Sequence, residues 1–453
     1  MGLTSDICEI MHATRYESLG DECVARVKQA IQDGVAVALA GCGEPPVTLA
    51  LAHAKSLGGA PQASVWGAGF KASVVQAANL NAMATHVLDF EPMWSPPTHS
   101  VSPTVPVAFA LAELNGATGR EIIAAVAKGL EIQGRLQYAG DQFVPEQLLF
   151  HPPGVAGVLG SAIVASTLLG LDVNGMRHAF GIAASRAGSL LANVGSMTKC
   201  THCGNAAASG LDAALLAQRG FTANPAIFEA RAGYVATFFD AGFDYAALLA
   251  FGRPFRCVDP GIAIKFYPSK YPTHYAIGAA LELRRAIPDI SRVTALRIVT
   301  PEIDDADRPQ PRSGLEGKFS FQYTAAIALL DGAVGIASFT DERRFRADVT
   351  ALLGKISLMR DATIPRDTRT MRVEIEADLS DGARERAVCT KPPGSWGAPV
   401  DPALHAQKMR DCLRTRLAPE QLAPVLAALD RLEQLNAREV GALIARLTVT
   451  KSA

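Results

Sequence analysis

The chain has 453 residues, of which 49% are hydrophobic and 19% charged, and its formal net charge is −1. This length exceeds what one ordinary hydrophobic core can organise, so we expect at least two domains. The near-neutral charge, with basic residues scattered along the chain, offers no field that would attract a polyanion, which excludes nucleic acid as the expected partner.

The first half of the chain predicts helices joined by short glycine and proline turns, with no strand. Thr118, with Glu121 three residues later, has the spacing of a capping box at a helix start. Apolar residues at helical spacing predict helices over Asp21 to Ala40, Gly116 to Leu136, Gly154 to Leu169, Gly175 to Ala184 and Asn205 to Gln218.

The 18 residues from Gly154 to Leu171 carry no charge, which meets the length of a membrane-spanning helix. Glycine, alanine, serine and threonine make up much of the segment, so its insertion into a membrane would be weakly favourable. Pro152 and Pro153 precede it, and no aromatic belt flanks it. The composition favours a buried helix, and we expect no membrane partner.

The pattern changes after Asp259. Alternating apolar residues predict a strand from Val293 to Val299, and a second from Met371 to Ala377 that turns at Ser380 to Gly382 and returns antiparallel from Arg384 to Thr390. Helical spacing reappears at Tyr275 to Ala286, Ser320 to Leu330 and, beyond Asp401, Leu422 to Leu447. The predicted fold is therefore mainly α: residues 1–259 and 396–453 form a large helical domain, and residues 260–395 form a smaller inserted α+β domain.

Familiar cofactor signatures are absent. The sequence has no dinucleotide or phosphate-binding glycine loop, no His-Glu-x-x-His and no Gly-x-Ser-x-Gly. Cys200 and Cys203 form a Cys-x-x-Cys pair, but no second pair completes a zinc site, so a redox or zinc role is the weaker interpretation. The beginning of the chain lacks the layout of a secretory signal, and the eight cysteines show no paired spacing. We expect a cytoplasmic protein with reduced thiols, without metal or organic cofactor.

Four polar stretches stand out in apolar surroundings. The first runs from His86 to Ser100, the second surrounds His151, the third runs from Gly195 to Asn205 as a loop entering a helix, and the fourth runs from Lys265 to His274. His151 directly precedes the small-residue helix, and a helix N-terminus favours a bound anion.

These stretches resemble those of the 2-methylcitrate dehydratase (MmgE/PrpD) family and occur in the same order. The Leu-Asp-Phe and later His of that family are matched at Asp89 and His99, and its His-Pro-x-Gly stretch at His151. Its Gly-Ser-x-Thr-Lys stretch is matched from Gly195, and its Tyr-Pro segment ending in Thr-His is matched at Tyr267 and His274. A run from Ser313 to Tyr323 is similar to its lid-domain segment.

The resemblance implies a helical domain plus a lid domain, commonly as a homodimer, with the active site between the domains. It also implies the site residues. Asp89, His99, His151, Lys199 and His274 are the expected catalytic residues, and Lys265, Tyr267, Lys270 and Tyr323 are the expected substrate-binding residues.

The chain departs from the family pattern at two positions. Met93 stands where the decarboxylases have a threonine of the site, and Lys270 stands where a cysteine is common. Both departures leave the particular substrate open. His202 is expected to be structural, and Arg186 either binds a substrate carboxylate or forms a buried ion pair.

These residue types suit proton transfer next to a carboxylate. Removing such a proton places charge on an already anionic group, so cations such as Lys199 must lie where that charge grows. Histidine can act there as base or acid near neutral pH. We therefore predict a cofactor-independent lyase, either a dehydratase (a carbon-oxygen lyase) or a decarboxylase, acting on a small di- or tricarboxylic acid. An epimerase or racemase of a carboxylate remains an alternative, as does a non-catalytic metabolite-binding protein.

Overall fold

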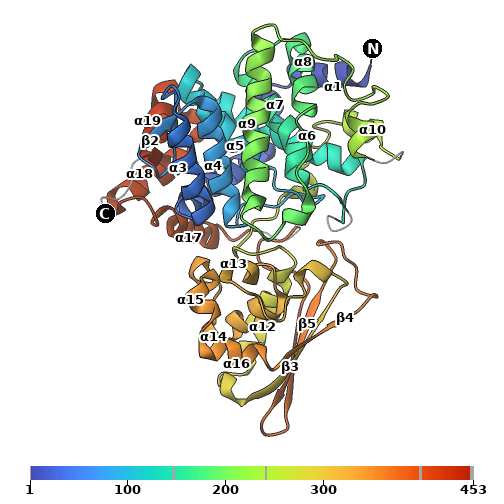
Figure 1. Ribbon diagram of the computed structural model, residues 1–453, viewed down its shortest axis with the longest axis vertical. Helices are drawn as coiled ribbons and strands as arrows, with labels where there is room; N and C mark the ends of the chain where they lie inside the picture. Colours follow the sequence, from blue (N-terminus) through green and yellow to red (C-terminus); the bar gives the residue numbers. More distant parts are fainter. Residues whose placement is uncertain (1, 145–147, 240–241, 397–399, 449–453) are drawn as a thin grey trace. The chain divides into compact units, whose positions relative to one another are not determined.

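Figure 1 shows the computed structural model of the chain, which describes residues 2–144, 148–239, 242–396 and 400–448. The chain divides into two compact units. Unit 1 comprises Met1–Val87, Glu91–Ile262 and Asp401–Ala453, and unit 2 comprises Leu88–Phe90 and Ala263–Val400. Parts of the predicted helical segment 396–453, namely 397–399 and 449–453, lie outside the described residues.

Unit 1 is built from helices contributed by both ends of the chain, as the predicted mainly α fold requires. Its helices are α1 (Leu3–Ala13), α2 (Asp21–Gly41), α3 (Pro45–Leu57), α4 (Val74–Val87), α5 (Val101–Asn115), α6 (Gly119–Ala139), α7 (Pro152–Leu168), α8 (Val173–Ala184), α9 (Thr198–Gln218), α10 (Tyr234–Phe238), α11 (Tyr245–Leu249), α17 (Pro402–Leu413), α18 (Pro419–Asp430) and α19 (Ala437–Thr448). The predicted capping box begins α6: the Thr118 amide donates to Glu121 Oε2 over 2.7 Å.

Helix α7 is the centre of unit 1 and packs against α5, α6, α8 and α9 (Figure 1). Its small residues allow this close approach. A Cβ atom on Gly210 of α9 would lie 2.4 Å from the carbonyl oxygen of Val158 on α7, which is too near for any side chain. The predicted burial of this apolar helix is confirmed, since Pro152 to Ser166 are all buried.

Two features of unit 1 differ from the sequence prediction. A short antiparallel hairpin pairs β1 (Ala63–Val65) with β2 (Phe70–Ala72), so the expectation of no strand in the first half is wrong. Strands of three residues are too short to show an alternating pattern. Helix α9 begins at Thr198 rather than at Asn205, so most of the predicted loop is helical.

Unit 2 combines a four-stranded sheet with helices. The strands are β3 (Val293–Thr300), β4 (Ile356–Arg360), β5 (Val373–Leu379) and β6 (Arg384–Cys389), in the order β4-β3-β5-β6. The helices are α12 (Thr273–Ala286), α13 (Gly314–Gly317), α14 (Phe321–Asp331), α15 (Asp341–Arg344) and α16 (Ala347–Leu353). Helix α12 packs on β5, β6 and α14 (Figure 1).

The predicted hairpin of unit 2 is confirmed: β5 and β6 are antiparallel, with Val373 opposite Cys389. The alternation in β5 buries every second side chain and leaves the charged ones on the other face. There Glu374 pairs with Arg386 of β6. Strand β4, which runs parallel to β3, was not predicted, because its mixed sequence ISLMR shows no regular alternation.

Two further properties concern the whole described chain. All eight cysteines are free and buried. Among the described residues, no single helix has the length and apolar character needed to cross a membrane, whereas α2 and α3, bent by 81° at their junction, meet the criterion only as a pair.

Candidate functional site

Three helices of unit 1 begin close together. Ser100 caps α5, His151 caps α7, and Lys199 is the second residue of α9. The three helices contact one another pairwise. The N-terminus of a helix is the positive end of its dipole, so this junction favours an anion, although Pro152 and Pro153 leave the first two residues of α7 without an amide N–H.

A cluster of histidines lies at this junction. The ring centroids of His99 and His151 are 6.1 Å apart. His86, from the last turn of α4, lies 4.5 Å from His99 and 5.6 Å from His151 between ring centroids. The Nδ1 atoms of His151 and His202 are 3.1 Å apart, within hydrogen-bonding distance, and all four side chains are buried. We call these four residues the histidine cluster.

Glu91 organises one side of the histidine cluster. It is fully buried, and its Oε1 lies 2.5 Å from His86 Nδ1 and 3.0 Å from His99 Nδ1. The hydroxyl of Ser102 donates to the same oxygen over 2.6 Å. Burial raises the pKa of the Glu91 carboxyl, but the positive potential and hydrogen bonds of His99 and His86 outweigh it and hold the pKa well below its ordinary value.

An ionised Glu91 fixes the tautomers of its two histidine neighbours. A carboxylate only accepts hydrogen bonds, so the Nδ1 atoms of His86 and His99 must carry the protons. In a neutral ring the Nε2 atom then has the lone pair. The Nε2 atoms of these two rings lie on the side opposite to Glu91, which is the orientation that a histidine acting as acid or base needs.

Burial lowers the pKa of three histidines of the cluster, which keeps His86, His151 and His202 neutral near pH 7. Burial lowers the pKa of His86 to about 4, with the charge of Lys199 adding to the effect and Glu91 opposing it. Burial, followed by Lys199, lowers the pKa of His202 to about 4 and that of His151 well below its ordinary value. A cation close to several neutral bases gives a site that attracts anions and accepts protons.

The histidine cluster also has the composition of a metal site. His86, His99 and His151 each offer a ligand atom, and these atoms lie within 4.8 Å of one another. Imidazole ligands whose second nitrogen donates to a carboxylate are typical of transition-metal sites. The three side chains could thus hold a divalent transition metal. From the sequence we expected no metal and did not identify this group of ligands.

The loop that carries His99 is fixed by buried polar contacts. Within it, the Trp94 amide donates to the carbonyl of Thr98 over 3.0 Å. The guanidinium of Arg256 donates to the carbonyl of Ser95 over 2.6 Å, and Arg256 is itself buried. Met93 is buried in the same loop. An ordered loop holds the histidine in one orientation, which general acid-base chemistry needs.

Unit 2 contains a second group of the predicted residues. Lys265, which is fully buried, forms an ion pair with Asp89. Asp89 has φ 53°, a left-handed backbone conformation that is strained for a residue other than glycine and is frequent at functional positions. Burial, followed by the charge of Lys265, lowers the pKa of His274 well below its ordinary value, whereas Asp89 raises it. We call Asp89, Lys265 and His274 the aspartate group.

Aromatic rings surround the aspartate group. Tyr267 and Tyr271 each lie 5.1 Å from His274 between ring centroids. Burial raises the pKa of Tyr267 to about 12, so this hydroxyl stays protonated and can donate a hydrogen bond. Lys318, buried and not predicted, donates to the carbonyl of Leu88 over 3.4 Å, next to Asp89.

Two predicted substrate-binding residues are engaged elsewhere in unit 2. Lys270 Nζ lies 2.5 Å from Oδ1 of Asp305, a half-exposed carboxylate. The buried hydroxyl of Tyr323 donates to the carbonyl of Ser338 over 2.6 Å, which gives this side chain a packing role. Contact of either residue with a substrate stays a prediction.

The structure also corrects the interpretation of Arg186 and agrees with the low weight given to a redox role of Cys200 and Cys203. Arg186 lies beyond the end of α8 and forms an exposed ion pair with Asp212, with 2.7 Å between the charged atoms, so it is neither in a helix nor in a buried pair. Cys200 and Cys203 lie on α9, and burial raises the pKa of Cys200 to about 11, which leaves a thiol unsuited to redox chemistry.

Sequence reasoning did not assign His86 and Glu91 to the site, although they contribute most of the contacts of the histidine cluster. A glutamate five residues after a histidine across a helix end is no recognised motif. The only signal was the gathering of polar residues from His86 to Ser100 in an apolar part of the chain.

Comparison with known proteins agrees with this description. Residues 5–246 match the MmgE/PrpD N-terminal domain and residues 267–434 match the MmgE/PrpD C-terminal domain. The cis-aconitate decarboxylases of Mus musculus and Homo sapiens are each 30% identical to the chain, over 96% of its length and 91% and 92% of theirs. The 2-methylcitrate dehydratase of Cupriavidus necator is 27% identical, over 83% of both chains. Matches that cover nearly the whole sequence show that the chain belongs to the MmgE/PrpD family.

Proposed function

We propose that the chain is a lyase that acts on a small di- or tricarboxylic acid by moving a proton next to a carboxylate, without a cofactor. The observation that carries the proposal is the arrangement of the histidine cluster and Lys199 where α5, α7 and α9 begin. That arrangement offers bases and a positive potential in one place. Relatives named for decarboxylation of cis-aconitate and for dehydration of 2-methylcitrate support the substrate class.

The substrate carboxylates are bound by positive charge. The positive dipole ends of α5, α7 and α9 and the ammonium of Lys199 supply it in unit 1. Lys265 supplies a fully buried cation in unit 2. As electrons move onto a substrate carboxylate and form an enediolate, these cations stabilise the added charge. Loss of one such donor typically slows the reaction about 10²- to 10³-fold.

The proton is moved by the histidines. His99 is oriented by Glu91, and His151 is positioned by His202. We assign His99, His151 and His274 as the acid-base residues, with Asp89 orienting or assisting His274.

Dehydration and decarboxylation can share this equipment. In dehydration a base takes the proton next to the carboxylate, the electrons form the double bond, and an acid protonates the departing hydroxyl. In decarboxylation the bond to the leaving carboxylate breaks, carbon dioxide departs with its electrons left on carbon, and an acid protonates that carbon. The two mammalian relatives, at 30% identity, make cis-aconitate the first substrate to test.

The test is a turnover assay of the purified chain with cis-aconitate and with 2-methylcitrate, in normal and deuterated water. Release of carbon dioxide identifies a decarboxylase, and a new alkene absorbance identifies a dehydratase. Deuterium entering recovered substrate without either product identifies an epimerase. Binding without any of these changes identifies a metabolite-binding protein and refutes the proposal.

Variants connect any turnover to the site. We expect Lys199→Met and His274→Gln to lower kcat/KM by about 10²-fold or more, because they remove a cation and a proton-transfer residue. Lys55→Met and His53→Gln change exposed residues of α3 and are the matched controls. Full activity in the first pair would exclude the assignment, provided that circular dichroism shows all four variants folded.

A further inference from the structure

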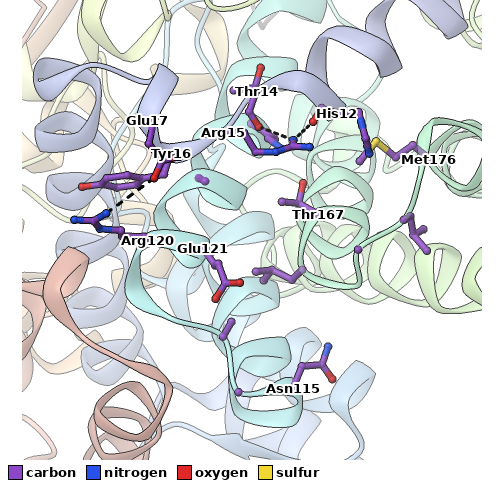
Figure 2. A pocket seen from close by; sticks show the side chains of 17 residues that line it. His12, Thr14, Arg15, Tyr16, Glu17, Asn115, Arg120, Glu121, Thr167 and Met176 are labelled. Carbon is purple, nitrogen blue, oxygen red and sulfur yellow. Dashed lines mark hydrogen bonds and ion pairs between the residues drawn. The ribbon is translucent and has the colours of Figure 1, made fainter.

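A pocket of about 570 Å³ opens in unit 1 among residues that belong to neither the histidine cluster nor the aspartate group. Its walls come from the end of α1, the segment after it, the ends of α5 and α7, and the first half of α6. This volume is in the range of small-molecule sites. Figure 2 shows Tyr16 and Arg120 on one side of the pocket and His12, Thr14 and Arg15 on another.

Lys128 is the unusual residue of this pocket. It lines the cavity from α6 and is only 2% exposed, yet among the described residues its ammonium has no hydrogen-bond or ion-pair partner. Burial, followed by the charge of Arg15, lowers the pKa of Lys128 to about 8. Its Nζ atom is not among the enclosed polar atoms that lack a partner, so the ammonium is reached from the cavity, where water or a ligand can contact it. Such a group is satisfied when a ligand brings an acceptor to it.

A second polar group in the wall of the pocket also lacks a hydrogen-bond partner among the described residues. The hydroxyl of Thr167, at the end of α7, is buried and finds no hydrogen-bond partner in the described part of the chain. A hydroxyl can donate to an anionic oxygen. Lys128 is therefore the donor that the cavity reaches, whereas the Thr167 hydroxyl is enclosed in the wall beside it.

The charges around the pocket favour an anion. Arg15 and Arg120 line it together with Lys128. Arg120 stacks on Tyr16 at 5.1 Å, and its ion pair with Glu17 is long, 4.0 Å, and exposed, so its charge is little compensated. The other lining carboxylate, Glu121, is engaged with Thr118 in the capping box. The C-terminal ends of α1, α5 and α7 also line the pocket, but they carry only partial negative charges, which balance the three cations incompletely.

We propose that this pocket binds a small organic or inorganic anion, a carboxylate or a phosphate, through the cations Lys128, Arg15 and Arg120 that line it. The site is separate from the proposed catalytic residues, because none of them lines it. A metabolite bound there stabilises the starts of α6 and the segment after α1. The pocket is therefore a second ligand site, independent of whether the lyase assignment holds.

The test is calorimetric titration of the full chain with citrate and, separately, with inorganic phosphate, at constant ionic strength with chloride as reference. The titrations use Lys199→Met, so that anion binding at the histidine cluster is weakened. We expect binding of at least one of the two anions, and Lys128→Met on this background should raise Kd about ten-fold or more, since a charged donor is lost. Binding of citrate alone assigns a carboxylate ligand, and binding of phosphate alone assigns a phosphate.

Lys55→Met, which alters an exposed lysine of α3, is the control and should leave Kd unchanged. Unchanged binding in Lys128→Met, or no binding of either anion to Lys199→Met, would overturn the proposal. A measurement on the unaltered chain guards against misfolding of the variants. Hydrogen exchange of the segment from Thr14 to Ser18 should slow when the anion is added, and an unchanged rate there would also overturn it.

Discussion

Replacing Glu91 by glutamine tests the organisation of the histidine cluster most directly. The amide keeps the size of the side chain and one accepting oxygen, but it removes the charge that fixes the protons of His86 and His99 on Nδ1. Its NH2 group falls where Glu91 Oε2 now lies, buried and without a partner among the described residues. An unsatisfied buried donor costs about 1–3 kcal/mol, partly offset because no charge is buried any longer.

We therefore expect Glu91→Gln to lower the free energy of unfolding by only about 1–2 kcal/mol. Activity should fall much further, by about 10²- to 10⁴-fold in kcat/KM, because a histidine with the wrong tautomer or orientation cannot transfer the proton. That loss corresponds to about 3–5 kcal/mol of transition-state stabilisation.

The assay measures kcat/KM across pH together with urea unfolding. Since the charge of Glu91 raises the pKa of His86, its removal should also move the acid limb of the pH profile to lower pH. Glu91→Asp, which keeps the charge, should recover part of the activity. Glu113→Gln is the matched control, because Glu113 also accepts hydrogen bonds, from Ser64, away from the cluster. Near-normal activity and an unmoved profile in Glu91→Gln would refute this account.

Three further predictions concern the buried ion pair, His86 and the metal-binding capacity of the histidine cluster. Lys265→Met should lower the free energy of unfolding in urea by about 3–5 kcal/mol, because it leaves the Asp89 carboxylate buried without its cation. The double variant with Asp89→Asn should regain most of this loss. Equal destabilisation of the single and double variants would contradict the ion pair. The pKa of His86 is lowered to about 4 in the folded state and is about 6.5 in the unfolded state, so the unfolded state takes up the proton first as the pH falls. The free energy of unfolding should therefore decrease by up to about 3 kcal/mol between pH 6.5 and pH 4. A pH dependence as steep in His86→Asn as in the wild type would exclude His86 as its source. Prolonged dialysis against a chelator, with metal analysis, should leave turnover unchanged; activity lost and then regained on adding zinc would assign a metal to His86, His99 and His151 instead.

The larger elements of the fold could be predicted from the sequence because they repeat a clear pattern. The capping box at Thr118 and the alternation in β5 are local signals, and the structure has both. The start of α9 was placed too late, since Thr198 to Cys203 contain threonine, cysteine and histidine, which have modest helix propensity. Packing of α9 against α7 supplies the stability that propensity does not.

The candidate site was less predictable. Lys265 and Asp89 were both named from the family resemblance, but nothing in the sequence indicates that they form an ion pair across 176 positions of the chain. His86 could not be assigned because a histidine at the end of an apolar helix is more often a packed core residue. Only the fold reveals that it shares a carboxylate with His99.

The joint beginning of α5, α7 and α9 has a consequence for how such a protein can change over evolutionary time. Part of its attraction for negative groups resides in the aligned peptide dipoles of the main chain, which replacement of one side chain leaves in place. Histidines and lysines there can be replaced one by one while acidic metabolites still bind. Such a scaffold can acquire a new reaction without first losing the class of molecule that it holds.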